Sequence, residues 1–68
     1  MVDGLSNTVR AAREDRGWTQ AELAERMGVS RKTVNTVENG VFVPSTIVAL
    51  KLARALETTI EELFTLEA

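Results

Sequence analysis

The sequence predicts an all-α domain of five short helices in one compact bundle. Its apolar residues recur at helical spacing, whereas no stretch of useful length alternates as a strand would. Serine and threonine residues suited to helix N-caps also alternate along the chain with glycines suited to helix ends. A chain of 68 residues is expected to form a single domain, residues 1–68, close to the smallest size at which one apolar core is sufficient.

The first predicted helix is recognised by its apolar spacing. Leu5, Val9 and Ala12 follow the i, i+4, i+7 pattern that places side chains on one face of a helix. The pattern predicts a helix over about residues 6–16 that stops at Gly17.

Residues 19–40 predict two capped helices joined by a tight turn. Thr19 and Glu22 form a capping box that begins the first of them, and Gly28 ends it. Ser30 is a second N-cap, so the next helix begins within about three residues of the last one. This is the compact turn of a helix-turn-helix motif, and the second helix is expected to extend over about Arg31 to Asn39.

Two further helices complete the expected bundle. Ser45 is an N-cap for a fourth helix, whose predicted apolar face consists of Ile47, Leu50, Ala53 and Leu56. Residues 59–62 repeat the capping box and begin a short fifth helix that contains Leu63 and Phe64.

Two charged residues are expected on apolar stripes. At about 100° per residue, Arg13 lies roughly 40° from Val9, and Glu38 lies roughly 40° from Val34. A partly buried charge is tolerable only when it is paired, so these positions indicate an ion pair between the first and third helices. The alternative is two independently solvated side chains that reach the surface.

The outward side of the third helix has the chemistry of a nucleic-acid reader. It carries Arg31, Lys32, Asn35, Thr36 and Asn39. In the major groove, lysine and arginine can donate to guanine, asparagine can pair with adenine, and threonine can contact thymine. Gln20, at the start of the preceding helix, would hold a phosphate with its amide and the free backbone N–H groups. In isolation such a set is more often an ordinary solvated face, and its position on the second helix of the motif reverses that preference.

The charge balance is the main argument against nucleic acid. The formal net charge is −2, whereas nucleic-acid-binding domains are usually basic on the contacting face. The local distribution differs, because residues 26–36 contain three cations, Arg26, Arg31 and Lys32, and no anion. The local potential is therefore suited to DNA.

The composition argues against an enzyme and against a metal or cofactor site. The chain has no cysteine and no histidine, which removes disulfides, thiolate nucleophiles, imidazole bases and the common zinc ligand sets. No pair of nucleophile and base is identifiable among the remaining residues. The first residues contain neither a basic region nor an apolar signal segment, so a cytoplasmic protein is expected.

The segments WTQAELAERMGVSRKTV and VENG, with PS at 44–45 and IEELF at 60–64, resemble the Cro/C1-type (XRE-like) helix-turn-helix regulators of phages and bacteria, in a short single-domain form. The resemblance covers about Leu5 to Phe64 and implies a lambda-repressor-like domain that binds double-stranded DNA. It implies base contacts at Arg31, Lys32, Asn35 and Thr36. It implies phosphate contacts at Gln20, Ser30, Thr33 and Asn39. The Arg13 and Glu38 pair also matches an interior ion pair of the family.

Two positions depart from the family's pattern. After Gly40 the family commonly has a basic or polar residue, but this chain has the apolar residues 41–43. Phosphate affinity is therefore expected to be lower. Glu57 stands where the family usually has a glycine, so a left-handed helix end there would be strained or replaced by another ending.

The protein is expected to be a transcriptional regulator that binds specific DNA sequences and represses transcription by occupying an inverted-repeat operator. A homodimer is expected because one recognition helix reads only a few base pairs. The first candidate for the dimer interface is Phe64 and Leu66, with Met1 and Val2, and the second is Phe42 with Val43. For Phe64, closure of the core within one subunit is an equally good interpretation.

Two other functions remain open at this stage. An antitoxin of a toxin–antitoxin pair would use the same DNA reader and cover a partner protein with residues 41–43 or the C-terminal residues. A protein-interaction module without DNA binding would account for the acidic balance and the apolar loop.

Overall fold

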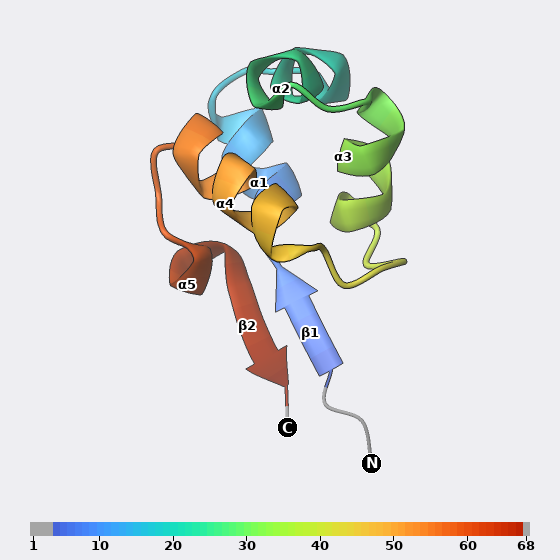
Figure 1. Cartoon of the computed structure of the whole chain (residues 1–68). Coiled ribbons are helices and arrows are strands. Elements are labelled where there is room, and N and C mark those ends of the chain that lie inside the picture. The colour runs from blue at the N-terminus through green and yellow to red at the C-terminus, as the bar shows by residue number, and fades with distance from the viewer. Residues whose placement is uncertain (1–3, 68) are drawn as a thin grey trace.

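The computed structural model describes residues 4–67, in which helices pack around one core and a short β-ribbon extends from them (Figure 1). The elements in chain order are β1 (Gly4–Asn7), α1 (Val9–Asp15), α2 (Gln20–Met27), α3 (Arg31–Glu38), α4 (Thr46–Ala55), α5 (Ile60–Leu63) and β2 (Phe64–Glu67). Met1 and Val2, considered above for a subunit contact, lie outside the described residues. Within residues 4–67, no helix combines the length and the apolar composition needed to cross a bilayer.

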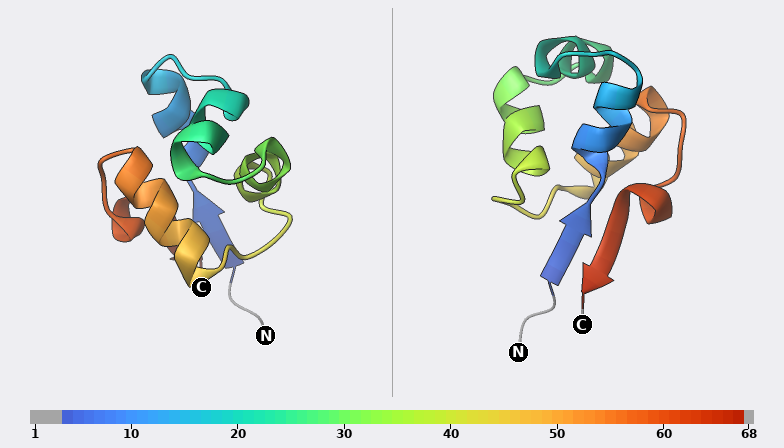
Figure 2. Two further views of the ribbon diagram at one scale, coloured as in Figure 1. Left: turned by 45° about the horizontal axis from the view of Figure 1, so that its top comes forward. Right: turned by 180° about the vertical axis from the view of Figure 1, so that it is seen from behind.

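The five predicted helices are present and the fold is mostly helical, but the all-α prediction is not fully exact, because both ends of the described chain form strands. β1 and β2 pair antiparallel, with Leu5 opposite Leu66 and Asn7 opposite Phe64. Figure 2 shows the two strands side by side in a ribbon that extends beyond the helices. Leu5 and Phe64, which the sequence placed on helices, therefore belong to a sheet. Strands of four residues are too short to show a period of two, and each is stabilised by its distant partner.

The side chain of Asn7 decides where β1 ends and α1 begins. Its Oδ1 accepts a hydrogen bond from the backbone N–H of Val9 at 3.1 Å, and its Nδ2 donates to the carbonyl of Val37 at 3.0 Å. α1 consequently begins at Val9 and not at Ser6 as predicted.

The predicted N-caps of the later helices are confirmed. The Thr19 hydroxyl accepts from the N–H of Glu22 at 3.1 Å, and the Glu22 carboxylate accepts from the N–H of Thr19 at 2.9 Å, which completes the capping box. Ser30, Ser45 and Thr59 each accept a backbone N–H three residues later in the same way. The turn between α2 and α3 is therefore set by local hydrogen bonds.

Four helices end on a residue in the left-handed conformation. These residues are Gly17, Gly28, Gly40 and Glu57. Glu57 has a φ of 55° and donates its N–H to the carbonyl of Arg54, while Thr58 donates to the carbonyl of Ala53 at 2.9 Å. This is the Schellman pattern that glycine normally completes. The left-handed end considered in the sequence analysis is thus present, with a glutamate in place of glycine.

The centre of the core holds one fully buried side chain from each of the four longer helices. Val9, Leu23, Val34 and Leu52 are fully buried. The predicted apolar face of α4 is wrong in part, because Ile47 and Leu50 are 66% and 54% exposed. α4 is apolar around most of its circumference, and the face that packs inward consists of Ala49, Leu52 and Ala53, followed by Leu56.

Phe64 and Leu66 differ in their surroundings. Phe64 is half-buried and packs against the core, which agrees with core closure within one chain. Leu66 is 73% exposed, although it has a strand neighbour in Leu5 that the sequence analysis did not identify.

Candidate nucleic-acid interface

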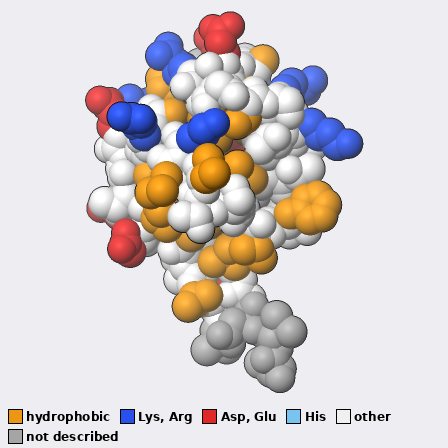
Figure 3. Space-filling view, in the orientation of Figure 1, with side chains coloured by type: hydrophobic (Ala, Val, Ile, Leu, Met, Phe, Trp, Pro, Cys, Tyr) orange, Lys and Arg blue, Asp and Glu red, His pale blue; other side chains and the backbone are white. Residues whose placement is uncertain are grey.

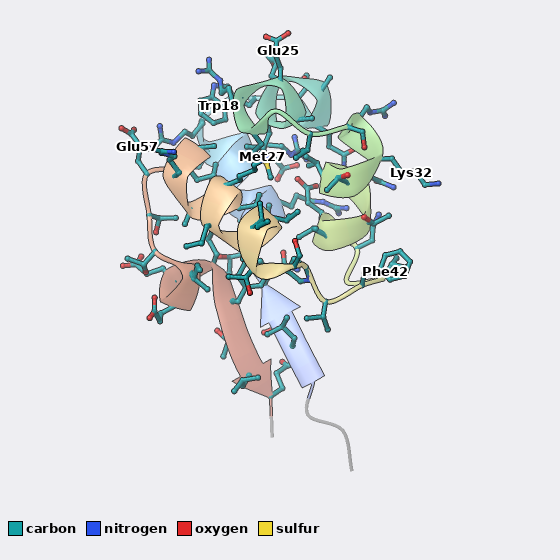
Figure 4. All side chains as sticks on the ribbon, viewed as in Figure 1. Trp18, Glu25, Met27, Lys32, Phe42 and Glu57 are labelled. Carbon is teal, nitrogen blue, oxygen red and sulfur yellow. The ribbon has the colours of Figure 1, made fainter. Side chains whose placement is uncertain are left out.

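α3 presents one side to the core and the other to solvent. Val34 and Val37 are buried, whereas Arg31, Lys32 and Asn35 are exposed and line a shallow depression on the outward side. Figure 4 shows Lys32 directed away from the body of the molecule. The helix thus holds three polar side chains outward while its apolar side fixes their position.

The three hydroxyl side chains of this region are already engaged within the helix. Ser30 Oγ accepts from the N–H of Thr33 at 3.2 Å and lies 3.0 Å from Thr33 Oγ1. Thr36 Oγ1 donates to the carbonyl of Thr33 at 3.0 Å, so its hydrogen is used inside α3. The methyl group and the lone pairs of Thr36, which is half-buried, remain for other contacts.

The pair between Arg13 and Glu38 joins α1 to α3. Arg13 Nε lies 2.7 Å from Glu38 Oε2, and Nη2 lies 3.2 Å from Oε1, a bidentate arrangement. The Arg13 side chain is 11% exposed, and that of Glu38 is fully enclosed. Arg13 Nη1 also donates to the carbonyl of Trp18 at 2.7 Å. The pair therefore fixes α3 to α1 and to the segment before α2.

The surroundings shift the pKa of both partners. Burial of the Glu38 carboxyl raises its pKa, but hydrogen bonds from Arg13 and Gln20 and the Arg13 charge outweigh burial, so the pKa lies below its ordinary value. The hydrogen bond that Arg13 donates to Glu38 is the main reason that the pKa of Arg13 lies above its ordinary value. Both groups are therefore held in their charged forms.

Gln20 connects α2 to the outward side of α3. Its Nε2 donates to Glu38 Oε1 at 3.1 Å and to Asn35 Oδ1 at 3.2 Å. Both amide hydrogens of Gln20 are thereby used. For an anion at the start of α2, the donors that remain are the backbone N–H groups of Gln20 and Ala21, because that of Glu22 is bonded to the Thr19 hydroxyl.

Arg10 is a member of this site that the sequence analysis missed. Its Nε lies 3.4 Å from Glu38 Oε1, and its Nη2 donates to Asn39 Oδ1 at 3.1 Å. Asn39 Nδ2 in turn donates to Asn35 Oδ1 at 3.1 Å. The available signal was position, because Arg10 precedes Arg13 by three residues on α1 and shares its face.

The surface beside these groups is basic. In Figure 3, basic side chains without acidic neighbours lie at the α3 edge, whereas at the opposite edge basic and acidic side chains lie together, and an acidic side chain lies over α2. The net charge of −2 is therefore unevenly distributed, and the α3 edge can face a polyanion.

Three comparisons relate this fold and surface to known proteins. The family model described as "Helix-turn-helix" matches residues 9–63. An uncharacterized HTH-type transcriptional regulator of Methanothermobacter thermautotrophicus is 47% identical over 64 residues, which are 93% of this chain and 93% of the relative. The antitoxin HipB of Escherichia coli is 34% identical over 53 residues, which are 78% of this chain and 56% of the relative.

A solved structure agrees with the same assignment. The restriction-modification controller protein C.AhdI of Aeromonas hydrophila superposes with a TM-score of 0.75 at 37% identity, covering 79% of this chain and 82% of that chain. The family match spans α1 to α5. The chain therefore belongs to the Cro/C1-type helix-turn-helix family.

Proposed function

We propose that this protein is a sequence-specific regulator that binds double-stranded DNA and represses transcription by occupying an inverted-repeat operator as a homodimer. The observation that carries the proposal is the outward side of α3, where Arg31, Lys32 and Asn35 are exposed on a helix clamped to α1 and α2. An α-helix fits the major groove, and these side chains match the hydrogen-bonding groups of base edges. The controller protein and the HTH-type regulators among the similar proteins support this choice.

Phosphate contacts complete the proposed interface. The backbone N–H groups at the start of α2, beside Gln20, and the side chains of Ser30, Thr33 and Asn39 flank the base-reading residues. Contacts of this type fix the register of the protein on the duplex, whereas contacts to base edges specify the sequence.

The test compares single substitutions on matched and mismatched duplexes. Lys32→Ala should reduce discrimination at one base pair by about tenfold or more, because it removes a donor to a base edge. Thr33→Ala should weaken binding to all duplexes by a similar factor, because it removes a phosphate contact. Lys51→Ala on α4 is the control, since it removes the same charge at a position away from α3.

Binding titrations at two salt concentrations distinguish the outcomes. Equal losses on every duplex from Lys32→Ala and Thr33→Ala would show that the two roles are wrongly assigned. Absence of any salt-sensitive binding to duplex DNA would contradict the function itself and favour a protein-interaction module.

A second candidate function is that of an antitoxin that binds both DNA and a toxin. It is favoured by the likeness to HipB and by the exposed loop of Val41, Phe42 and Val43, which are 60%, 66% and 79% exposed. Co-expression with the product of a neighbouring reading frame, followed by size measurement of the purified complex, tests this function. Phe42→Glu should then abolish the complex and leave DNA binding intact.

A further inference from the structure

We infer that Asn35 reads a base only as a hydrogen-bond donor, so that it favours guanine and cannot make the paired contact with adenine. The inference rests on the proposed function, because it concerns what α3 does once it lies in a major groove. It follows from three side-chain amides, those of Gln20, Asn35 and Asn39, which we call the amide network.

The Glu38 carboxylate fixes the orientation of the Gln20 amide, the first member of the amide network. Glu38 can only accept hydrogen bonds when it is ionised, so Gln20 must direct its NH₂ group toward Glu38 Oε1, 3.1 Å away. The same NH₂ group lies 3.2 Å from the Asn35 side chain and has one hydrogen left. Asn35 must therefore present its oxygen, Oδ1, to Gln20.

The Arg10 guanidinium fixes the orientation of the Asn39 amide at the other end of the network. Arg10 can only donate, so Asn39 must present its oxygen to Arg10 Nη2, 3.1 Å away. Asn39 is then left with its NH₂ group, which lies 3.1 Å from Asn35 Oδ1. The Glu38 carboxylate and the Arg10 guanidinium thus require the same orientation of the Asn35 amide, in which Oδ1 accepts from both Gln20 and Asn39.

Both lone pairs of Asn35 Oδ1 are occupied as a result. One accepts from Gln20 and the other from Asn39. Among residues 4–67, no acceptor is hydrogen-bonded to Asn35 Nδ2, and the residue is exposed on the outward side of α3. Asn35 therefore offers two N–H donors and no free acceptor.

Because Asn35 offers donors and no free acceptor, only base edges that present acceptors can pair with it. A paired contact with adenine needs one donor and one acceptor from asparagine, because adenine shows the N7 acceptor beside the N6 donor. Guanine shows two adjacent acceptors, N7 and O6, and thymine shows the O4 acceptor, whereas cytosine shows a donor. The residue type alone predicted adenine, and the amide network reverses that preference.

The experiment begins with selection of bound duplexes from a random pool. The pool is selected with the native protein and with Asn35→Ala, and the position that loses its preference in the variant is the one that Asn35 reads. Titrations with each of the four bases at that position then follow. We expect guanine, which can accept from both N–H groups of Asn35, to bind at least about fivefold more tightly than adenine, which can accept from one.

A second variant tests the cause of the preference. Asn39→Ala removes one donor from Asn35 Oδ1 and frees a lone pair for adenine N6. Affinity for all duplexes should fall, but the ratio of adenine to guanine affinity at the Asn35 position should rise by at least about threefold. Lys51→Ala on α4, away from α3, is the control and should leave that ratio unchanged. Circular dichroism melts verify that each variant is folded.

The failures of the two proposals are distinguishable. If the native protein enriches a sequence but prefers adenine at the Asn35 position, the inference is overturned. It is also overturned if Asn35→Ala changes no position, or if Asn39→Ala leaves the ratio unchanged. If the native protein enriches no sequence at all, the proposed function is the part that fails.

Discussion

The Glu38 carboxylate collects charged and polar donors from two other helices. Arg10 and Arg13 approach it from α1, and Gln20 approaches it from α2. An ionised carboxylate without solvent exposure is tolerable because these donors replace the lost water. Among residues 4–67, no buried side-chain nitrogen or oxygen lacks a hydrogen-bond partner. One residue thus holds together the three helices that carry the proposed interface.

Removing one partner of the Arg13 and Glu38 pair should destabilise the fold. Arg13→Ala leaves a buried carboxylate with fewer donors, at a cost of about 3 kcal/mol, the low end for buried pairs, because Arg13 retains 11% exposure. Urea melts of Arg13→Ala, Glu38→Ala and the double variant form a double-mutant cycle. The double variant should lose less than the sum of the single losses, and additive losses would show that the two side chains do not stabilise each other.

Glu38 should also make stability depend on pH in the acid range. Its pKa in the folded protein lies below the ordinary value of 4.5, so the unfolded chain binds the proton first as pH falls. The stabilisation is fully present above pH 4.5 and is lost as pH falls through the folded pKa. In urea melts between neutral and acid pH, Glu38→Gln should lose less stability on acidification than the native protein.

A matched carboxylate provides the control for this pH dependence. Glu25 on α2 is exposed and points away from the molecule (Figure 4). Glu25→Gln should retain the acid loss of the native protein. If Glu38→Gln retained it as well, the loss would come from other carboxylates.

At the scale of the helices, the end of α4 stores strain that the other left-handed ends avoid. Glu57 has a side chain at a φ of 55°, where glycine is favoured. Glu57→Gly should be more stable than Glu57→Ala by about 1 kcal/mol, because only glycine relieves the left-handed strain. Both variants lose the exposed contact with Arg16, so their difference in thermal or urea melts isolates the backbone. Equal stability of the two would show that the left-handed end is not strained.

The helix starts could be predicted from the sequence because their causes are local. Thr19, Ser30, Ser45 and Thr59 each bond a backbone N–H three residues away, and that spacing is visible in the sequence. The strands could not be predicted in this way. Leu5 finds Leu66 only after the helices have packed, so no short window contains both members of the pair.

The sequence predicted which side of α3 carries the candidate site, but not whether each side-chain amide presents its donor or its acceptor outward. Helical spacing placed Lys32, Asn35 and Asn39 on the outward side of α3. It carried no information on which end of each amide points outward, because that depends on Arg10 and Glu38 from two different helices. Spacing also failed on α4, where apolar residues on several sides left the inward face undefined.

At the scale of the molecule, apolar side chains outside the core favour a dimer. Leu66, Ile47 and Leu50 are 73%, 66% and 54% exposed. Two copies related by a two-fold axis would place their α3 helices about 34 Å apart, one turn of DNA. Leu66→Glu should shift the protein toward monomer in sedimentation at micromolar concentration, since it places a charge in an apolar contact. Phe42→Glu, at the second candidate surface, is the matched comparison.

Two results would change this assignment of the interface. A protein that is monomeric both free and on DNA would refute the dimer. A dimer that tolerates Leu66→Glu and dissociates with Phe42→Glu would move the interface to the loop between α3 and α4.

The β1–β2 ribbon pairs residues that are far apart in the sequence, and this affects the order in which the elements fold. Its partners come from opposite ends of the sequence, so pairing closes a loop of nearly the whole chain and carries the entropy cost of that closure. Packing of the helices brings the two strands close together and so lowers this entropy cost. The N–H of Thr8 then donates to the carbonyl of Leu63 at 2.9 Å, beside the ribbon. We therefore expect the ribbon to be the last part to form and the first to open in hydrogen exchange, while α3 keeps the protection of the core. We expect local opening of the β1–β2 ribbon to leave the proposed base-reading side of α3 in place.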